Sequence, residues 1–435
     1  MRKILVLATH LFLFSAATSF GQSKVPATSG TYLKEYNTVV KAAEKGIVIE
    51  NVRIIDGNGN QPIEKGFVVV QKGVITEVGS GSVSNELRNT LEVVNGAGKS
   101  LMPGLLDAHL HSVNDYEFLQ KFLGNGVTTM RDPGHPFTFY QAINFTDKPL
   151  PRIFLTGPHL DSHPAAYSQQ ATLVKNDAHA KSMIESNVKN GGTGVKIYFR
   201  LPLKYYRSVI ETARAKKIPV FAHLELVSAT DAINAGINGI EHVTSFGTSI
   251  AEPAVKENFI KKVDANNNAR GEERYRLWAS LDMNSPKVKE AIKLAVEKKI
   301  FLCPTLATFE KQAGKNPSDD YKVKGFQNML KFVEMAHKAG VKIVVGSHSS
   351  SEYSKPGWTY QREMELLAMA GMTPLEIIKA STVLNADYFG NSTRLGSIKP
   401  GKAADLLLVD GNPAADIKDM YQINAVMLNG NWVKK

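Results

Sequence analysis

The residue types between Leu101 and Tyr116 could bind a metal ion. This stretch reads LMPGLLDAHLHSVNDY, and its apolar run leads to Asp107, His109 and His111. Side chains alternate between the two faces of a strand, so these three side chains would point the same way. Two imidazoles about 6–7 Å apart along one strand can converge on one metal ion. A strand that carries polar residues into a loop is the alternative, and the histidines found later in the chain favour the metal site.

Further ionisable side chains stand within or after other apolar, strand-like segments. Lys196 lies inside GVKIYF, and a buried lysine is costly unless it is paired or chemically altered. His223 ends PVFAH, His242 ends GIEH, and His348 follows VVGS. For any one of these histidines alone, a hydrogen-bonded structural role would be the better interpretation. Together with the pair in DAHLH they end four different predicted strands, which favours one shared site.

The segments that carry these residues belong to a repeating pattern. From Leu105 to about Phe389, apolar strands alternate with polar loops and amphipathic helices. The eight predicted strands are Leu105–His109, Thr128–Arg131, Arg152–Thr156, Gly194–Phe199, Pro219–His223, Gly239–His242, Ile300–Cys303 and Lys342–Gly346. This pattern predicts a closed (β/α)8 TIM barrel, in which functional residues gather at the carboxyl ends of the strands. Residues 251–284 interrupt the pattern, and either a helical lid over the barrel mouth or a surface excursion would account for them.

Short β segments stand on both sides of this predicted barrel. Residues 46–100 contain strand-like runs separated by turns such as DGNG, and residues 390–435 return to the same pattern. One small β-sandwich domain built from both termini explains both sets most economically. The predicted α/β chain therefore has a polar lead at 22–45, sandwich parts at 46–100 and 390–435, and a catalytic barrel at 101–389.

The first 21 residues have the features of a signal peptide. Arg2 and Lys3 precede a mostly apolar run from Ile4 to Phe20, and Gly21 supplies the small residue that a signal peptidase needs. No comparable apolar stretch follows. We therefore expect an exported protein, periplasmic or secreted, that has no membrane span after the signal peptide at 1–21 is cleaved.

The composition is that of a globular protein, with 43% hydrophobic and 21% charged residues. The formal net charge of +11 is spread along the chain without a basic stripe interleaved with aromatics, so we do not expect nucleic-acid binding. Cys303 is the only cysteine, and its apolar surroundings predict a small buried side chain. A small-molecule substrate is the expected partner, and a homo-oligomer is compatible with the sequence.

The sequence resembles the amidohydrolase superfamily, in the branch with imidazolonepropionase-like and prolidase-like enzymes. The resemblance runs from about Ile47 to Val433 and is strongest in PGLLDAHLH and in GSIKPGKAADL, which is similar to the segment that returns to the family's β-sandwich. It implies two divalent metal ions, and zinc suits the ligand types best. His109 and His111 would bind the more buried ion.

The same resemblance assigns the other ligands and the reaction. Lys196, carboxylated by carbon dioxide, would bridge both ions, and His223 and His242 would bind the second ion. Tyr198 would contact the substrate carbonyl or carboxylate, unless it is a barrel-packing aromatic. The implied reaction is cleavage of a C–N bond by a metal-bound hydroxide, because the ions lower the pKa of water and one of them polarises the carbonyl.

The last strand departs from the family pattern. The family usually has an aspartate there, which binds the buried metal and shuttles the proton, whereas this chain has His348 and no acid until Glu352. A histidine can bind a metal and accept a proton, but it cannot contribute a negative charge. Three outcomes stay open: a hydrolase in which His348 is the catalytic base, an altered one-metal site, and a catalytically degenerate scaffold that only binds.

Substrate contacts are expected from residues near the barrel mouth. Arg200 and Tyr198 would suit a free carboxylate, so dipeptides and N-acyl amino acids are the expected substrates, and cyclic amides are an alternative. Trp358 and Gln361 belong to a loop expected to face the substrate, where relatives often carry a histidine in place of the glutamine. His163 follows the third strand, as does His159, and a plain loop histidine is the alternative for each.

Overall fold

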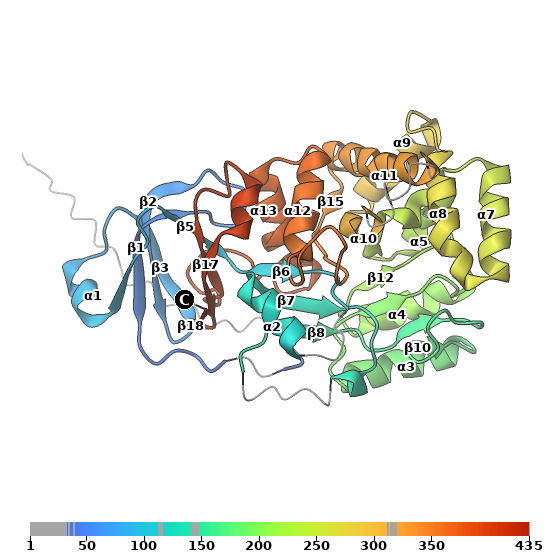
Figure 1. The fold of residues 1–435 in the computed structure, drawn as a ribbon. Coiled ribbons are helices and arrows are strands. Elements are labelled where there is room, and N and C mark those ends of the chain that lie inside the picture. Colours follow the sequence, from blue (N-terminus) through green and yellow to red (C-terminus); the bar gives the residue numbers. More distant parts are fainter. Residues whose placement is uncertain are drawn as a thin grey trace, which may run out of the picture.

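The computed structural model describes residues 33, 35–37, 40–111, 116–140, 148–310, 313 and 320–434. The predicted signal peptide and most of the polar lead lie outside these residues. No helix in the described ranges is long and apolar enough to cross a membrane. Figure 1 shows a β domain at one end of an elongated molecule and a larger domain of strands and helices beside it.

An eight-stranded sheet joins the two ends of the chain. Its order is β18-β17-β16-β5-β1-β2-β3, and β4 pairs with β1. The strands are β1 Ile47–Ile54, β2 Ile63–Gln71, β3 Val74–Ser80, β4 Glu92–Asn95, β5 Lys99–Pro103, β16 Leu406–Asp410, β17 Ile423–Leu428 and β18 Asn431–Lys434, with helix α1 Asn85–Thr90 before β4. Ile49, Val68, Leu101, Leu408 and Met427 share one apolar core, so both segments build the small domain, as predicted.

The larger domain contains all eight predicted barrel strands in order. They are β6 Leu105–Asp107, β7 Val127–Asp132, β8 Arg152–Leu155, β11 Val195–Ile197, β12 Val220–Ala222, β13 Gly239–Glu241, β14 Phe301–Cys303 and β15 Lys342–Ile343. They lie in two parallel sheets, β6-β7-β8 and β10-β9-β11-β12-β13-β14-β15, where β9 His159–Asp161 and β10 Ala171–Leu173 are additional short strands. The domain is therefore TIM-barrel-like, but its strands do not form one closed hydrogen-bonded sheet.

Individual hydrogen bonds span the two interruptions of the ladder. Between β15 and β6, the His348 N–H donates to His109 O at 2.5 Å and the His111 N–H donates to His348 O at 2.8 Å. Between β8 and β11, the Thr193 N–H donates to Leu155 O at 2.8 Å. The first interruption coincides with the segments that carry predicted ligands, because these residues leave regular strand geometry there.

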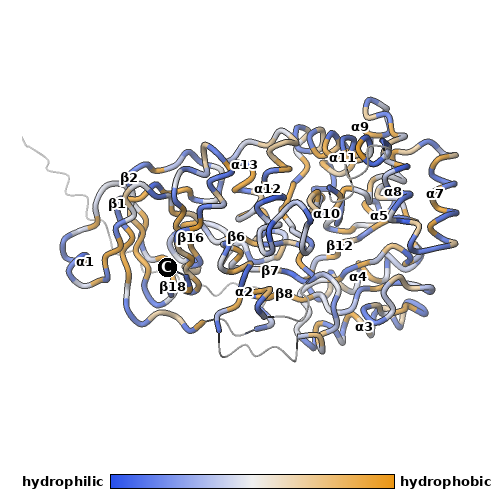
Figure 2. The backbone as a smooth tube through the Cα atoms, in the orientation of Figure 1, coloured by the Kyte–Doolittle hydropathy of each residue, from blue (hydrophilic) through white to orange (hydrophobic). Residues whose placement is uncertain are grey.

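Helices follow the strands and cover them on the outside (Figure 1). The helices are α2 Tyr116–Gly124, α3 Asp177–Lys189, α4 Tyr206–Ala215, α5 Ala229–Ala235, α6 Gly247–Ile250, α9 Pro286–Glu297, α10 Leu306–Glu310, α11 Asp320–Ala339, α12 Thr359–Met369, α13 Pro374–Ser381 and α14 Val383–Tyr388, with single 3-10 turns at η1 Phe137–Phe139, η2 Leu203–Tyr205, η3 Val243–Phe246 and η5 Ile417–Tyr421. In α11, Phe326, Met329, Phe332 and Val333 are buried at helical spacing. Figure 2 shows such apolar stripes in orange alternating with hydrophilic stretches.

The interruption at 251–284 is helical. It contains α7 Pro253–Ala265, η4 Asn267–Ala269 and α8 Arg270–Ala279. Trp278 of α8 is fully buried, and its ring centroid lies 5.7 Å from that of Phe332 in α11. The insertion is thus packed onto the barrel helices by apolar contacts.

One buried arginine joins the two domains. Arg152, at the start of β8, is fully buried, and its Nε and Nη2 donate to the Asp405 carboxylate at 2.6 and 3.1 Å. Its Nη1 donates to Glu35 Oε1 at 2.8 Å. Removal of one partner from a buried ion pair is strongly destabilising, because the other charge is left without compensation.

We therefore predict that Arg152→Met lowers the free energy of unfolding by about 3–5 kcal/mol, since Asp405 would stay buried without its cation. Urea denaturation followed by fluorescence measures this loss. The matched control is Arg207→Met, because Arg207 pairs with Glu211 on an exposed helix face, where water screens the pair, so its loss should leave the unfolding midpoint nearly unchanged. Equal midpoints for the two variants would contradict the prediction.

Candidate metal centre

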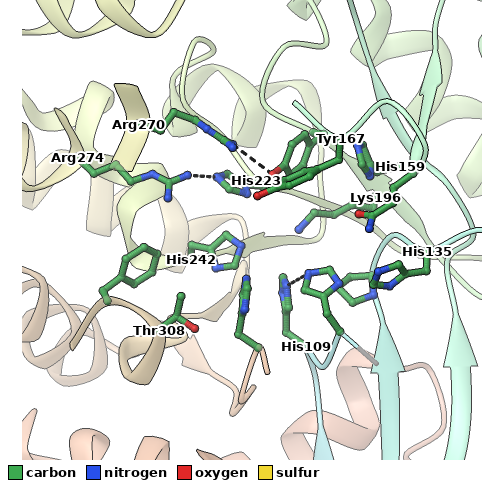
Figure 3. Close-up of a pocket in the computed structure, with 16 residues that line it drawn as sticks. His109, His135, His159, Tyr167, Lys196, His223, His242, Arg270, Arg274 and Thr308 are labelled. Carbon is green, nitrogen blue, oxygen red and sulfur yellow. Dashed lines mark hydrogen bonds between the residues drawn. The ribbon is translucent and has the colours of Figure 1, made fainter. Parts of the chain in front are cut away.

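A pocket of about 300 Å³ lies at the carboxyl ends of the parallel strands (Figure 3). Its lining includes every predicted metal ligand and both predicted catalytic residues. These are His109 and His111 after β6, Lys196 and Tyr198 of the β11 segment, His223 after β12, His242 after β13, and His348 after β15. Residues that are far apart in sequence therefore converge because parallel strands end at the same edge.

The imidazole rings are packed closely. The ring centroid of His242 lies 4.7 Å from that of His109, 4.5 Å from that of His223 and 5.4 Å from that of His348. Burial, followed by the nearby cationic groups, lowers the pKa of His109, His223 and His242 well below the ordinary value. These rings are therefore neutral at neutral pH, which is the state in which imidazole binds a metal.

Partners outside the pocket orient the rings. Nδ1 of His109 lies 2.5 Å from Glu241 Oε2, and Nδ1 of His242 lies 2.7 Å from Thr305 Oγ1. With Nδ1 of His109 engaged, its Nε2 lies 3.0 Å from Nε2 of His111. Two nitrogen lone pairs at that distance repel unless a proton or a cation lies between them. Hydrogen-bonded partners of this kind fix the tautomer and the direction of metal-binding imidazoles.

The backbone also directs two of the histidines. His242 and His348 have φ values of +69° and +68°, as does Thr305 at +51°. Non-glycine residues with positive φ cost about 1–3 kcal/mol each and persist where the surrounding structure holds them. Here the His242 N–H donates to Cys303 O at 2.8 Å, which holds the turn after β13. Both residues thus lie in turns after their strands, and both line the pocket.

Lys196 is the strongest indication that the pocket binds a cation. Its side chain is buried, and its Nζ has no hydrogen-bond partner among the residues that the structure describes. Burial lowers the pKa of Lys196 to about 8. A buried amine without a partner is costly, whereas a carboxylated lysine would offer two oxygens to a cation. The neutral imidazoles and this amine fit a site for divalent metal ions.

His348 and Asp107 have different positions in this site. The His348 ring lies parallel to that of His109 with the centroids 5.2 Å apart, so it belongs to the cluster. Asp107, expected to share a face with the two histidines, does not line the pocket. Its carboxylate accepts from the Ser347 hydroxyl at 2.5 Å and from the Ser347 N–H at 3.0 Å, and burial raises its pKa to about 7. Asp107 therefore ties the segment before His348 to β6.

Two arginines that the sequence did not single out border the pocket from the insertion. Nε of Arg274 donates to Glu225 Oε1 at 2.6 Å, and its Nη2 lies 3.0 Å from Nε2 of His223. Nη1 of Arg270 donates to the Tyr198 hydroxyl at 3.2 Å. The many charges of residues 251–284 were the available signal, but nothing in the sequence indicated which of them face inward.

Two further histidines, His135 and His159, line the pocket, and Asp132 lies behind them. His135 lines the pocket, and its Nδ1 lies 2.7 Å from Asp132 Oδ2. Asp132 Oδ1 also lies 3.6 Å from Nδ1 of His111, and these two histidines hold the pKa of Asp132 well below its usual range. His159 lines the pocket as well, although a plain loop position was the alternative.

Arg200 and His163 do not reach the pocket, contrary to expectation. The Arg200 guanidinium turns to the insertion, where its Nε donates to Asn267 Oδ1 at 2.7 Å and its Nη1 to Asp264 Oδ1 at 2.8 Å. β11 ends at Ile197, so the alternation that would have kept Arg200 on the pocket face does not continue to it. His163 is exposed in the loop after β9 and is not among the lining residues.

Trp358 and Gln361 also lie away from the pocket. The Trp358 ring packs against Tyr421 of η5 with the centroids 5.3 Å apart. Gln361 is buried in α12, and its Nε2 donates to Asn125 O at 2.7 Å. Because α12 begins at Thr359, helical geometry rather than a loop sets the direction of the glutamine, and it faces the packing between elements.

Comparisons with known proteins agree with this geometry. Residues 100–433 match the model of the Amidohydrolase family. An ochratoxinase of Aspergillus niger is 25% identical over 467 residues, covering 95% of this chain and 93% of its own length. Among solved structures, a Xaa-Pro dipeptidase with bound methionine has a TM-score of 0.68 at 20% identity, covering 89% of this chain and 99% of that one. The A. niger ochratoxinase structure has a TM-score of 0.69 at 21% identity, covering 91% and 96%.

We predict that Lys196→Met lowers divalent-metal affinity by about tenfold or more, on the scale of other losses around metal ligands. Elemental analysis after dialysis measures the metal retained per chain. The metal-free variant should be more stable than the metal-free parent by about 1–3 kcal/mol, because a buried amine without a partner is removed. Lys181→Met, on an exposed helix face, is the control. Unchanged metal content in Lys196→Met would show that Lys196 is not a ligand.

Proposed function

The chain belongs to the amidohydrolase family, and from this premise we propose that it is a metal-dependent hydrolase of C–N bonds in small amides, such as dipeptides or N-acyl amino acids. The observation that carries the proposal is the amine of Lys196, which has no hydrogen-bond partner among the described residues and lies among seven imidazoles in one pocket. The prolidase and ochratoxinase neighbours support an action on amide bonds.

His109, His111, Lys196, His223 and His242 would hold two divalent ions, and zinc suits this nitrogen-rich set. When bound, such ions would lower the pKa of a water molecule and polarise the substrate carbonyl. The chain's own contribution is to keep the imidazoles neutral, buried and oriented from outside. Carboxylation of Lys196 would give the site the negative charge that its lining otherwise lacks.

His348 is the proposed proton acceptor and donor. It lies within the cluster, with its ring centroid 5.0 Å from that of His111 and 5.2 Å from that of His109. An imidazole in this position can take a proton from the attacking water and return it to the leaving nitrogen. Such a role replaces the aspartate that relatives are expected to use.

The pocket favours a small substrate. Its volume of about 300 Å³ is at the lower end of the range for ligand pockets. Tyr167, Tyr198 and Phe309 supply apolar walls, and the Tyr198 hydroxyl supplies a polar contact. A dipeptide or a short N-acyl amino acid would fill this space while its amide lies against the imidazoles.

A catalytically silent binding protein is the second candidate function. The observation that favours it is the absence of a carboxylate among the described residues that line the pocket. Without an acid at position 348, metal retention and proton transfer both depend on neutral groups. The chain would then keep the pocket for binding and lack turnover.

A panel of X-Pro dipeptides and N-acyl amino acids, assayed with and without chelator, tests the proposal. We expect turnover of some members and a fall in rate of about tenfold or more on chelation, since water activation is lost with the ions. Readdition of zinc should restore the rate. Turnover that chelator does not affect would refute the metal mechanism, and no turnover on any member would favour the binding protein.

Two substitutions at position 348 separate the candidate functions. Asn and Asp both tolerate positive φ better than most residues, so they preserve the strained backbone. His348→Asn should lower kcat/KM by about 10²–10⁴-fold, the usual contribution of general acid–base catalysis, whereas His348→Asp should keep part of the activity. His179→Asn, in α3 and outside the pocket, is the control. Activity that His348→Asp creates in an inactive parent would establish the parent as a binding protein.

A further inference from the structure

Arg270, the first residue of α8, is buried beside the pocket without a carboxylate partner. It is 8% exposed, its Nε donates to Asn267 O at 2.9 Å, and its Nη1 donates to the Tyr198 hydroxyl at 3.2 Å. Within the described ranges, no ion pair joins Arg270 to an acid. A guanidinium removed from water in this way is costly unless an anion compensates its charge.

The other arginines in this region are compensated. Arg274 pairs with Glu225, the acid that also lies near enough to attract Arg270. Arg200 pairs with Asp264 and also donates to two backbone carbonyls of α7. Arg270 is therefore the member of this group whose charge is available to a ligand in the pocket.

Two further polar groups, Tyr198 and His159, line the same pocket as Arg270. His159 is 3% exposed, and its Nε2 has no hydrogen-bond partner among the described residues. Its ring centroid lies 4.4 Å from that of Tyr198, whose hydroxyl contacts Arg270. In Figure 3, Arg270, Tyr167 and His159 lie along one side of the pocket, and His109 lies along the other.

We propose that Arg270, Tyr198 and His159 form a subsite that binds the free carboxylate of the substrate. This inference rests on the proposed function and deepens it, because it restricts the substrates to amides whose amine portion carries an acid. A guanidinium matches a planar carboxylate with two parallel hydrogen bonds, and Tyr198 and His159 add donors beside it. The scissile amide would then lie between this subsite and the imidazoles.

This subsite assigns a task to the insertion. Arg270 belongs to residues 251–284, and the buried Trp278 fixes α8 onto the barrel helices. The barrel strands supply the groups that act on the amide, whereas the insertion supplies the charge that selects the substrate. Arg270 is thus a specificity-determining residue.

Binding of two matched probes tests the subsite without requiring turnover. Levulinate is the analogue of N-acetylglycine in which a methylene replaces the amide nitrogen, so it cannot be hydrolysed. Its alcohol analogue carries a hydroxymethyl group in place of the carboxylate. Ligand-observed NMR titrations of the metal-loaded full chain give both dissociation constants. We expect the parent to bind levulinate about tenfold or more tightly than the alcohol, as for a buried charge-assisted pair.

Arg270→Gln should reduce this preference to less than about twofold, a loss of about fivefold or about 1 kcal/mol, while affinity for the alcohol changes little. Arg270→Lys, which keeps the charge but not the planar fork, should keep part of the preference and covers the case in which the glutamine variant fails to fold. Arg276→Gln is the matched control, since Arg276 lies on the exposed face of the same helix. In an assay with an amide that the parent protein hydrolyses, Arg270→Gln should raise KM more than it lowers kcat.

Equal binding of the two probes by the parent would overturn the subsite, and so would an unchanged preference in Arg270→Gln. Inorganic phosphate that binds more tightly than levulinate, and in an Arg270-dependent manner, would also overturn the carboxylate assignment in favour of a phosphoryl group. A carboxylate preference without turnover on the amide panel would refute the proposed hydrolase and leave the subsite standing. Turnover of neutral amides without a carboxylate preference would refute the subsite and leave the proposed hydrolase standing.

Discussion

The imidazoles of His109, His223 and His242 share one pocket because burial keeps them neutral, and partners outside the pocket hold His109 and His242. Seven rings and one amine crowd the same space, and a positive charge on any of them would repel the rest. Glu241 holds His109, Asp132 lies beside His111, and Thr305 holds His242, so the negative or accepting groups stand outside the pocket and the lone pairs face into it. This arrangement costs free energy in the absence of a cation and is stabilised by one. It is the constraint on which the account of the site depends.

The fold maintains this costly arrangement through rigid surroundings. Asp107 ties β6 to the segment before His348, and Glu241 also accepts from Arg131 Nη2 at 2.7 Å and from the Tyr388 hydroxyl at 3.0 Å. The positive φ values of His242 and His348 are tolerated because neighbouring strands hold those turns. Stability elsewhere, in the apolar core and the two-domain junction at Arg152, compensates for strain at the site.

Much of this organisation could be predicted from the sequence, since strand-end residues follow directly from periodicity. The segments around His109, Lys196, His223 and His242 are short apolar runs with one ionisable residue, and parallel strands bring such residues to one edge. The directions of side chains that lie beyond a strand end could not be predicted in the same way. Arg200 lies three residues after β11 ends, so its side chain follows the turn and the insertion rather than the strand. Arg270 lines the pocket and Arg200 does not, because helix α8 borders the pocket although it comes from a distant part of the sequence.

Anomalous X-ray scattering from crystals of the purified protein, recorded at the absorption edges of first-row transition metals, tests the central claim most directly. The account predicts peaks inside the pocket that are bonded to His109, His111, His223 and His242, with continuous density that extends from Lys196 to them. Crystals with no peak in the pocket, or with peaks only at histidines away from it such as His163 and His179, would contradict it.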